Sequence, residues 1–219
     1  MIIALARRGL NAQPVGDSRL REIMKVKVKF VAVALAVVAA CAEADTWTAD
    51  PDHTEVRAYW DHSGFSEQSL EFTKFDGSLQ FSLDAVPQSN AFFSIPVSSI
   101  ATGVAQLDKD LLGPTFFDVE NFPNISFQSS SFRQVGPRSV IVTGDLTIKD
   151  VTKAATFDVT VLNLGEHPVG RFYKPFQGTW LGVFAVATIK RSEWGMGAFV
   201  PIGSDEIRIE INSELKAEN

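Results

Sequence analysis

Short stretches in which apolar and polar residues alternate follow one another along the chain between residues 46 and 214. In the first of them, Val56, Ala58 and Trp60 alternate with Glu55 and Arg57. A period of two residues is typical of a β-strand that buries one face, because successive side chains point to opposite sides of a sheet. This stretch therefore predicts a strand whose apolar side chains face a core.

The same period recurs further along the chain, and turn residues such as Gly136 and Pro137 separate the stretches. Many short strands with turns between them predict an all-β fold, either a barrel or a sandwich. Pro96 lies within one stretch and predicts that its strand is at an edge or beside a bulge. The segment 106–112 lacks this period and is rich in helix formers, so we expect a short helix there, over one end of a barrel. Further strands are expected at 75–81, 91–97, 140–148, 156–161, 180–189 and 206–211, and another is expected to begin at Ile125.

The N-terminal region has the features of a secretory signal peptide. A basic start at Met24 is followed by about a dozen apolar residues and then by the small-x-small sequence ending at Ala44. The apolar run is shorter than the roughly 20 residues that a membrane span needs. We therefore expect residues 1–23 to be a mis-annotated or non-native leader, 24–44 to be the signal peptide, and 45–219 to be one exported domain in the periplasm.

Cys41 supports a second interpretation of this region. Together with the preceding Val38-Ala-Ala it resembles a lipobox, in which the cysteine would be acylated and would anchor a lipoprotein. If cleavage instead precedes Asp45, the mature chain has no cysteine. Its stability would then come from core packing rather than from disulfides.

The composition is that of one ordered globular domain, with 45% hydrophobic residues, 21% charged residues and 17 Phe. Removing residues 1–44 takes away seven of the 20 Lys and Arg and three of the 26 Asp and Glu, so the mature chain has a net charge of −10. This charge disfavours nucleic acid and anionic membrane surfaces as direct partners. Brief encounters with a lipid surface are still compatible with this charge.

The polar residues give little support for catalysis. His62 lies beside Asp61 and Ser63, but neighbours on a strand point to opposite faces and do not form a Ser-His-Asp site. His53, His62 and His167 lack the close spacing of metal ligands. We therefore expect no catalytic residue, no metal and no cofactor. His62 is expected to satisfy backbone groups at a barrel mouth or to hydrogen-bond the headgroup of a ligand.

Two charged clusters have competing interpretations. Asp108, Lys109 and Asp110 on the expected helix form either a solvated face or cap, or the charged surface of a mobile gate. Arg191, close to Trp194, predicts a structural corner in which the guanidinium satisfies backbone carbonyls, with Arg-Trp stacking as the alternative.

Several strings in order resemble the YceI-like family of periplasmic polyisoprenoid-binding proteins, from about Trp47 to Glu214. They include Asp50-Pro-Asp-His-Thr-Glu-Val, Phe116-Phe-Asp-Val, Thr143-Gly-Asp-Leu-Thr-Ile and Ile189-Lys-Arg-Ser-Glu-Trp-Gly. The resemblance implies an extended, lipocalin-like antiparallel barrel with an apolar channel for a prenyl chain such as a quinone tail, usually in a homodimer. The chain departs from the family pattern at Leu111, where His is common, at Asp150, where Gly is common, and at Ala58, where Phe is common.

Within such a barrel, the inward residues of the predicted strands would offer an isoprenoid an apolar wall. The expected function is periplasmic binding of a long-chain isoprenoid lipid, a prenyl quinone or polyprenyl species, for carriage or storage without catalysis. The alternatives are a stress-related protein-protein interaction module and an enzyme acting on an apolar substrate. The predicted wall residues are Val56, Ala58, Trp60, Leu79, Phe81, Phe93, Ile95, Phe127, Leu146 and Phe184, with His62 as the headgroup contact.

Overall fold

The computed structural model describes residues 44–218. The leader, the body of the expected signal peptide and Cys41 lie outside these residues. In the described part of the chain, no helix is both long enough and apolar enough to span a membrane. The strands and the helix are β1 (Asp45–His62), β2 (Ser66–Phe72), β3 (Asp76–Phe81), β4 (Asn90–Pro96), β5 (Ile100–Ala101), α1 (Ala105–Leu112), β6 (Asn124–Gly136), β7 (Ser139–Ile148), β8 (Val151–Glu166), β9 (Thr179–Lys190) and β10 (Glu206–Ala217). Short 3-10 turns are η1 (Val86–Gln88), η2 (Val97–Ser99), η3 (Pro168–Arg171), η4 (Lys174–Phe176) and η5 (Arg191–Trp194).

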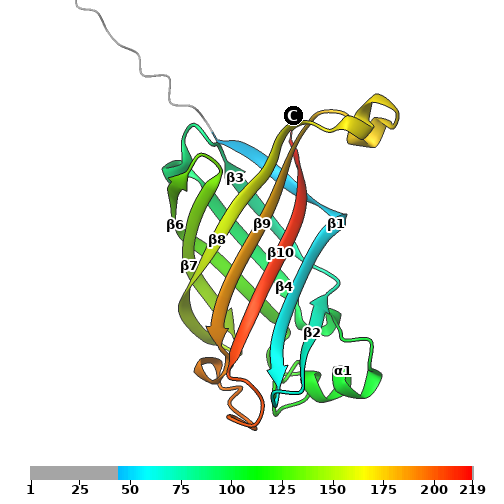
Figure 1. Ribbon diagram of the computed structural model, residues 1–219, viewed down its shortest axis with the longest axis vertical. Helices are drawn as coiled ribbons and strands as arrows, with labels where there is room; N and C mark the ends of the chain where they lie inside the picture. Colours follow the sequence, from blue (N-terminus) through cyan, green and yellow to red (C-terminus); the bar gives the residue numbers. More distant parts are fainter. Residues whose placement is uncertain (1–43, 219) are drawn as a thin grey trace, which may run out of the picture. The chain divides into compact units, whose positions relative to one another are not determined.

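Eight antiparallel strands close into a barrel in the order β1, β3, β4, β6, β7, β8, β9 and β10, with β10 pairing back onto β1 (Figure 1). This confirms a barrel rather than a sandwich. Along one edge, β1 pairs with two different strands: residues 45–47 pair with β3, and residues 56–62 pair with β2. An irregularity between Ala49 and Thr54 separates the two halves. β5 extends the sheet beyond β2.

The alternation read from the sequence matches the burial of the strands. In β7 every second residue from Val140 to Ile148 is buried, and in β10 Ile207, Ile209 and Ile211 share the inward face. The expected helix is confirmed as α1, and Figure 1 shows it at the end of the barrel where β1 finishes. Most strands of the barrel wall therefore have one face buried toward the interior and one face in contact with water.

The expectation at Pro96 is wrong. β4 is an interior strand, paired with β3 on one side and with β6 on the other. Pro96 is its last residue and lies two positions beyond Ser94, where pairing with β3 stops. A proline without a backbone N–H is tolerated there because the strand ends.

The turn between β7 and β8 shows how departures from the family pattern are accommodated. Lys149 and Asp150 form a two-residue turn between the paired Ile148 and Val151, and both have positive φ, 51° and 60°. These values match the turn type whose twist suits a hairpin, in which Gly is favoured at the second position. Asp tolerates the left-handed region better than most residues, so Asp150 replaces Gly without breaking the hairpin.

Candidate ligand-binding cavity

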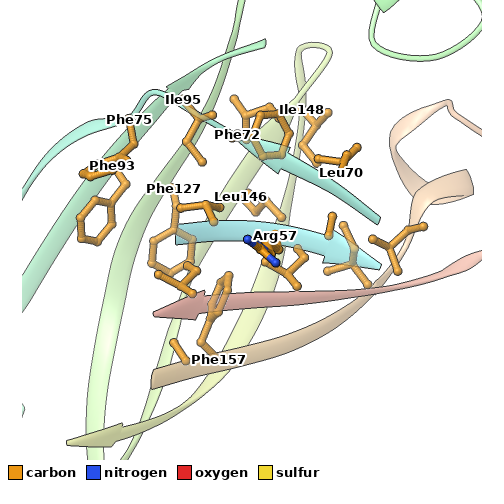
Figure 2. Close-up of a pocket in the computed structure, with 18 of the residues that line it drawn as sticks. Arg57, Leu70, Phe72, Phe75, Phe93, Ile95, Phe127, Leu146, Ile148 and Phe157 are labelled. Atoms are coloured by element: carbon orange, nitrogen blue, oxygen red, sulfur yellow. The ribbon is translucent and has the colours of Figure 1, made fainter. Parts of the chain in front are cut away.

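The barrel encloses a cavity of about 580 Å³, within the usual size range of small-molecule sites. Side chains from all eight barrel strands, β2 and α1 line it, and they are almost entirely aliphatic or aromatic (Figure 2). The ionisable residues at its border are Arg57, His62 and Arg191. Arg57 lies on the outward-facing parity of β1, where its guanidinium contacts Glu71 at 3.2 Å and Glu55 at 3.5 Å. The interior is therefore suited to a ligand that is mostly hydrocarbon.

The structure brings nearly all of the predicted wall residues together. Val56, Ala58, Trp60, Leu79, Phe81, Phe93, Ile95, Phe127 and Leu146 border the cavity, and so does His62. Their contact with a ligand remains a prediction.

Phe184 is the correction, because it lies on the outer parity of β9. The neighbours Val183 and Ala185 line the cavity instead. β9 is apolar on both faces, from Trp180 to Ile189, so a period of two could not show which set of residues points inward.

Two glycines position aromatic rings in the wall. A Cβ built on Gly144 would lie 2.5 Å from the ring of Phe127, and one built on Gly77 would lie 2.4 Å from the ring of Phe93. Only a residue without a side chain allows so close an approach. The two rings therefore pack against the neighbouring strands, and Phe127 also meets Phe157 edge-on, with 5.2 Å between ring centroids.

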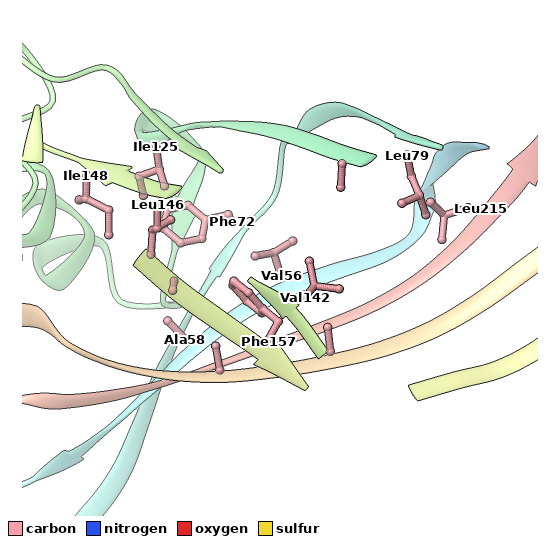
Figure 3. Close-up of a cluster of buried hydrophobic side chains, with 14 of the residues drawn as sticks. Val56, Ala58, Phe72, Leu79, Ile125, Val142, Leu146, Ile148, Phe157 and Leu215 are labelled. Carbon is pink, nitrogen blue, oxygen red and sulfur yellow. The ribbon is translucent and has the colours of Figure 1, made fainter. Parts of the chain in front are cut away.

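One end of the cavity, here called the closed end, is filled by buried side chains. The last lining residues in that direction are Ala49, Leu181 and Leu215, and the two leucines are almost fully buried. Trp47, the next inward residue of β1, is also almost fully buried, and its indole Nε1 donates a hydrogen bond to the carbonyl of Phe81 at 2.9 Å. Figure 3 shows Leu79 and Leu215 together at this end of the buried cluster.

The opposite end, here called the mouth, is marked by residues that both line the cavity and are exposed. These are His62 at the end of β1, Ser63 directly after it, and Phe199 and Ile202 in the loop between β9 and β10. The two segments are tied together, because the Ser63 hydroxyl donates a hydrogen bond to the carbonyl of Ile202 at 2.8 Å. Leu107 and Leu111 of α1, with Phe116 and Phe117, line the cavity beside this end.

Arg191 organises the β9–β10 loop at the mouth. Its guanidinium donates hydrogen bonds to the carbonyls of Ser204 at 2.8 Å, Ala198 at 2.8 Å and Gly203 at 3.3 Å, and to that of Met196. This confirms the predicted structural corner. Burial lowers the pKa of Arg191, although an arginine stays charged in proteins.

A carboxylate completes the same corner. Asp205 accepts hydrogen bonds from the backbone N–H of Ser192 at 2.8 Å and from its hydroxyl at 2.7 Å. These bonds favour the charged form and hold the pKa of Asp205 below its ordinary value. The loop is therefore fixed by hydrogen bonds although it is largely at the surface.

His62 is the polar side chain best placed to meet a ligand at the mouth. It is exposed, lines the cavity and forms an isolated β-bridge with Gly203. Within residues 44–218, no hydrogen bond is made to its imidazole. Both ring nitrogens are thus available to a polar group of a ligand.

The sequence did not predict one polar pair within the wall. The hydroxyls of Thr54 and Ser213 lie 2.8 Å apart and share a hydrogen bond, with both residues bordering the cavity near the closed end. Thr54 and Ser213 have the same parity as Val56 and Ile211, so the alternation places them on the inward face. They were missed because their side chains are polar, whereas the wall was predicted from apolar residues. Phe199 and Ile202 were missed for a different reason, since their loop has no period.

Potential metal ligands are scattered in the described part of the chain. Within residues 44–218, no three His, Cys, Asp or Glu side chains gather as metal ligands would. The cavity lining contains no carboxylate either. The geometry can hold and shield a hydrocarbon chain, with a hydrogen-bonding group at its mouth.

A closed antiparallel barrel of eight strands around an apolar cavity defines a lipocalin-like binding barrel. The profile of the YceI-like domain matches residues 47–215, which is most of the chain, and the chain belongs to this family.

Similar proteins agree with this assignment. A UPF0312 protein of Pseudomonas putida is 30% identical over 135 residues, covering 62% of this chain and 67% of the relative. A UPF0312 protein of Pseudomonas aeruginosa is 28% identical over 153 residues, covering 70% and 76%. Among solved structures, Burkholderia cenocepacia BcnA is similar with a TM-score of 0.68 and 25% identity, over 76% of this chain and 99% of the other. A polyisoprenoid binding domain from Saccharophagus degradans shares the fold with a TM-score of 0.56 and 12% identity, over 80% and 99%.

Proposed function

We propose that the protein binds one isoprenoid lipid non-covalently, with the tail in the cavity and the polar end at the mouth beside His62. The observation that carries this proposal is the continuous apolar cavity, closed at Trp47 and bordered by exposed residues at the other end. Membership of the YceI-like family supports the same class of ligand, as does the likeness to a domain described as polyisoprenoid binding.

The volume of the cavity limits how much tail it can hold. A cavity of about 150 Å³ takes one benzene, which corresponds to about 25 Å³ per carbon atom. On that scale, a cavity of about 580 Å³ holds about 23 carbons, enough for roughly four complete isoprene units of five carbons each. A longer tail would leave its remaining units at the mouth or outside.

The energetics favour carriage or storage over irreversible capture. Each carbon moved out of water contributes about 0.8 kcal/mol, so four units would be held strongly against water. The interior of a bilayer is as apolar as the cavity, however, so transfer between membrane and protein is nearly balanced. Such a protein exchanges its ligand with membranes, and the expected signal peptide would place this exchange in the periplasm.

A binding role also agrees better with the lining than catalysis does. Hydrolysis or group transfer usually needs a base and an acid in reach of each other. His62 lines the cavity without a carboxylate beside it in the lining. An enzyme acting on an apolar substrate would therefore lack the partner group at this site.

The direct test is organic extraction of the purified exported protein, followed by mass spectrometry. A stoichiometric prenyl quinone or polyprenyl species would support the proposal and identify the ligand. A clean extract, together with no uptake of added geranylgeraniol, a four-unit prenyl alcohol, would contradict it and favour an interaction module.

Ala58→Phe tests whether the cavity itself sets tail length. Ala58 is buried in the wall, and the added phenyl ring would fill about 150 Å³, the space of roughly one isoprene unit. We expect the longest tail that is fully held to fall from about four units to three, and affinity for geranylgeraniol to fall by about 4 kcal/mol. Titration with prenyl alcohols of increasing length would measure both.

Ala154→Phe is the matched control, because Ala154 is exposed on β8. It should leave the tail-length profile unchanged. Equal profiles for Ala58→Phe and the wild type would show that the ligand does not occupy this cavity.

A further inference from the structure

Three bulky apolar side chains stand exposed around the mouth, and together they are called the rim. Phe65 is 91% exposed, Phe199 is 67% exposed and Ile202 is 72% exposed. Phe65 lies in the turn between β1 and β2, and the other two lie in the β9–β10 loop. The bond from Ser63 to the Ile202 carbonyl, and one at 3.2 Å from the Ser204 N–H to the Asp61 carbonyl, join the two segments.

Hydrogen bonds to backbone carbonyls hold the loop that carries Phe199 and Ile202 in a fixed conformation. Arg191 holds four carbonyls of the β9–β10 loop, and the N–H of Gly203 donates to the carbonyl of Phe199 at 2.9 Å. Phe199 has a φ of 64°, in the left-handed region that bulky residues rarely adopt. A strained conformation of this kind persists only where surrounding contacts impose it, and such positions gather at functional sites.

The rim continues directly into the cavity. Phe199 and Ile202 border the cavity and are exposed to solvent at the same time. An apolar chain leaving the cavity therefore meets further apolar surface before it meets water. If the rim lay against the interior of a bilayer, the chain would pass between two apolar environments without hydration, which removes the largest barrier to transfer.

The opposite end of the barrel shows that exposure alone does not define this surface. Phe172 is also 91% exposed, in the β8–β9 extension (residues 167–178) that projects away from the barrel in Figure 1. None of the residues that line the cavity comes from this extension. Within the extension, the ring of Phe176 contacts that of His167, with 4.7 Å between centroids, and it also stacks on Trp180 of β9 at 5.1 Å.

We propose that the rim formed by Phe65, Phe199 and Ile202 docks the protein onto an uncharged or zwitterionic lipid bilayer for ligand exchange. This rests on the proposed function for the reason that only a lipid ligand needs such a route. Asp61 precedes Phe65 on the β1–β2 hairpin, where Glu67 is paired with Arg208, and residues 45–219 have a net charge of −10, so the charge of the protein opposes anionic headgroups. Aromatic and aliphatic side chains that reach below the headgroups are the usual means of such docking.

The experiment compares Phe65→Ser with Phe172→Ser, two equal changes at equally exposed phenylalanines. Phosphatidylcholine vesicles containing geranylgeraniol supply the lipid surface. Flotation measures docking, and the rate at which geranylgeraniol appears in the protein measures transfer. Binding of geraniol, a two-unit alcohol added from solution, measures the cavity alone.

We expect Phe65→Ser to lower both flotation and transfer about tenfold, the effect of removing one buried Phe side chain from the docked state. Phe172→Ser should behave like the wild type, and Phe65→Trp should restore docking because Trp also suits the interface. Geraniol binding should be the same in all four proteins. Adding phosphatidylglycerol to the vesicles should weaken flotation.

Equal transfer by Phe65→Ser and the wild type would overturn the docking proposal, and so would an equal loss in Phe172→Ser. Failure of the proposed function would look different, because the wild type itself would not bind geraniol. A wild type that binds geraniol but never floats with the vesicles would leave the cavity proposal standing and refute the rim.

Discussion

The two ends of the barrel expose similar side chains but differ in what lies beneath them. At the mouth, Phe199 and Ile202 are continuous with the cavity, and their loop is fixed by Arg191. At the other end, the β8–β9 extension exposes Phe172 and Tyr173 above a barrel interior that Trp47 and its neighbours fill. An exposed apolar patch is therefore a candidate route for a ligand only where a cavity lies directly beneath it; without a cavity it is ordinary protein surface.

The same difference divides stability from function. The closed end contains the largest fully buried side chains of β1, β9 and β10, so it contributes to the stability of the fold mainly through packing. The mouth instead depends on hydrogen bonds from one guanidinium to carbonyls. Changes at the closed end should consequently alter the length of the cavity, whereas changes at the mouth should alter the uptake of a ligand.

The strongest test is to open the closed end with Trp47→Ala. Losing an indole that is 2% exposed and bonds the carbonyl of Phe81 should cost about 4 kcal/mol of stability. The vacated space adjoins the cavity, so the longest tail that is fully held should increase by about one unit or more. Urea unfolding and titration with prenyl alcohols would measure the two effects.

Trp47→Leu provides the second variant if the alanine protein does not fold. Leucine keeps an apolar plug, so stability should fall less and the tail-length limit should move only slightly. A tail-length limit that is unchanged in a folded Trp47→Ala protein would contradict the assignment of this end as the stop.

Removing the hydrogen bonds that fix the loop at the mouth should lower stability slightly less than Trp47→Ala does. Arg191→Ala leaves the carbonyls of Met196, Ala198, Gly203 and Ser204 without their donor. An unsatisfied buried acceptor costs about 1–3 kcal/mol, and partial hydration of the loop would relieve some of it, so we expect a loss of about 3 kcal/mol. Denaturant unfolding gives the stability, and geraniol uptake should weaken as the mouth loosens.

Arg208→Ala is the comparison for that variant. Arg208 is partly exposed, pairs with Glu67 at 3.0 Å and lies 4.3 Å from the centre of the Tyr59 ring. Surface pairs of this kind contribute less than about 1 kcal/mol. If both arginines proved equally costly to remove, the special role of Arg191 at the mouth would be refuted.

The barrel and most of its wall could be predicted from the sequence, because strands with one wet face reveal their inward side. Val56, Ala58 and Trp60 illustrate this, since charged residues mark the other face. Phe184 could not be placed in the same way, because both faces of β9 are apolar and only the pairing of Val183 and Ala185 with their neighbours decides.

The ends of the cavity were harder to predict than its wall. Trp47 and Ala49 precede an irregularity that resets the alternation, and Phe199 lies in a loop whose conformation depends on contacts from Arg191. Neither local pattern nor residue type carries that information, because it depends on distant partners. The predicted corner at Arg191 is the exception, since a buried guanidinium must find acceptors.

The smallest expected effect is a pH dependence of stability that arises from His53, near the closed end. His53 Nδ1 lies 3.0 Å from the Asp50 carboxylate, and the ring also meets Phe176 of the β8–β9 extension, with 5.4 Å between centroids. The hydrogen bond to Asp50 raises the pKa of His53 above its ordinary value, and the charges of Asp50, Glu214 and Asp52 act in the same direction.

A raised folded-state pKa means that the folded protein holds this proton more tightly than the unfolded chain does. The stabilisation is therefore complete below the ordinary histidine pKa of about 6.5 and is lost as pH rises through the raised value. Because His53 is largely exposed, screening limits it to a few tenths of a kcal/mol. Asp50→Asn keeps an oxygen for the N–H of Asp52 but removes the charge, so it should lower the pKa of His53 measured by NMR and flatten this part of the pH dependence of unfolding. An unchanged pKa of His53 in that variant would show that Asp50 is not its cause.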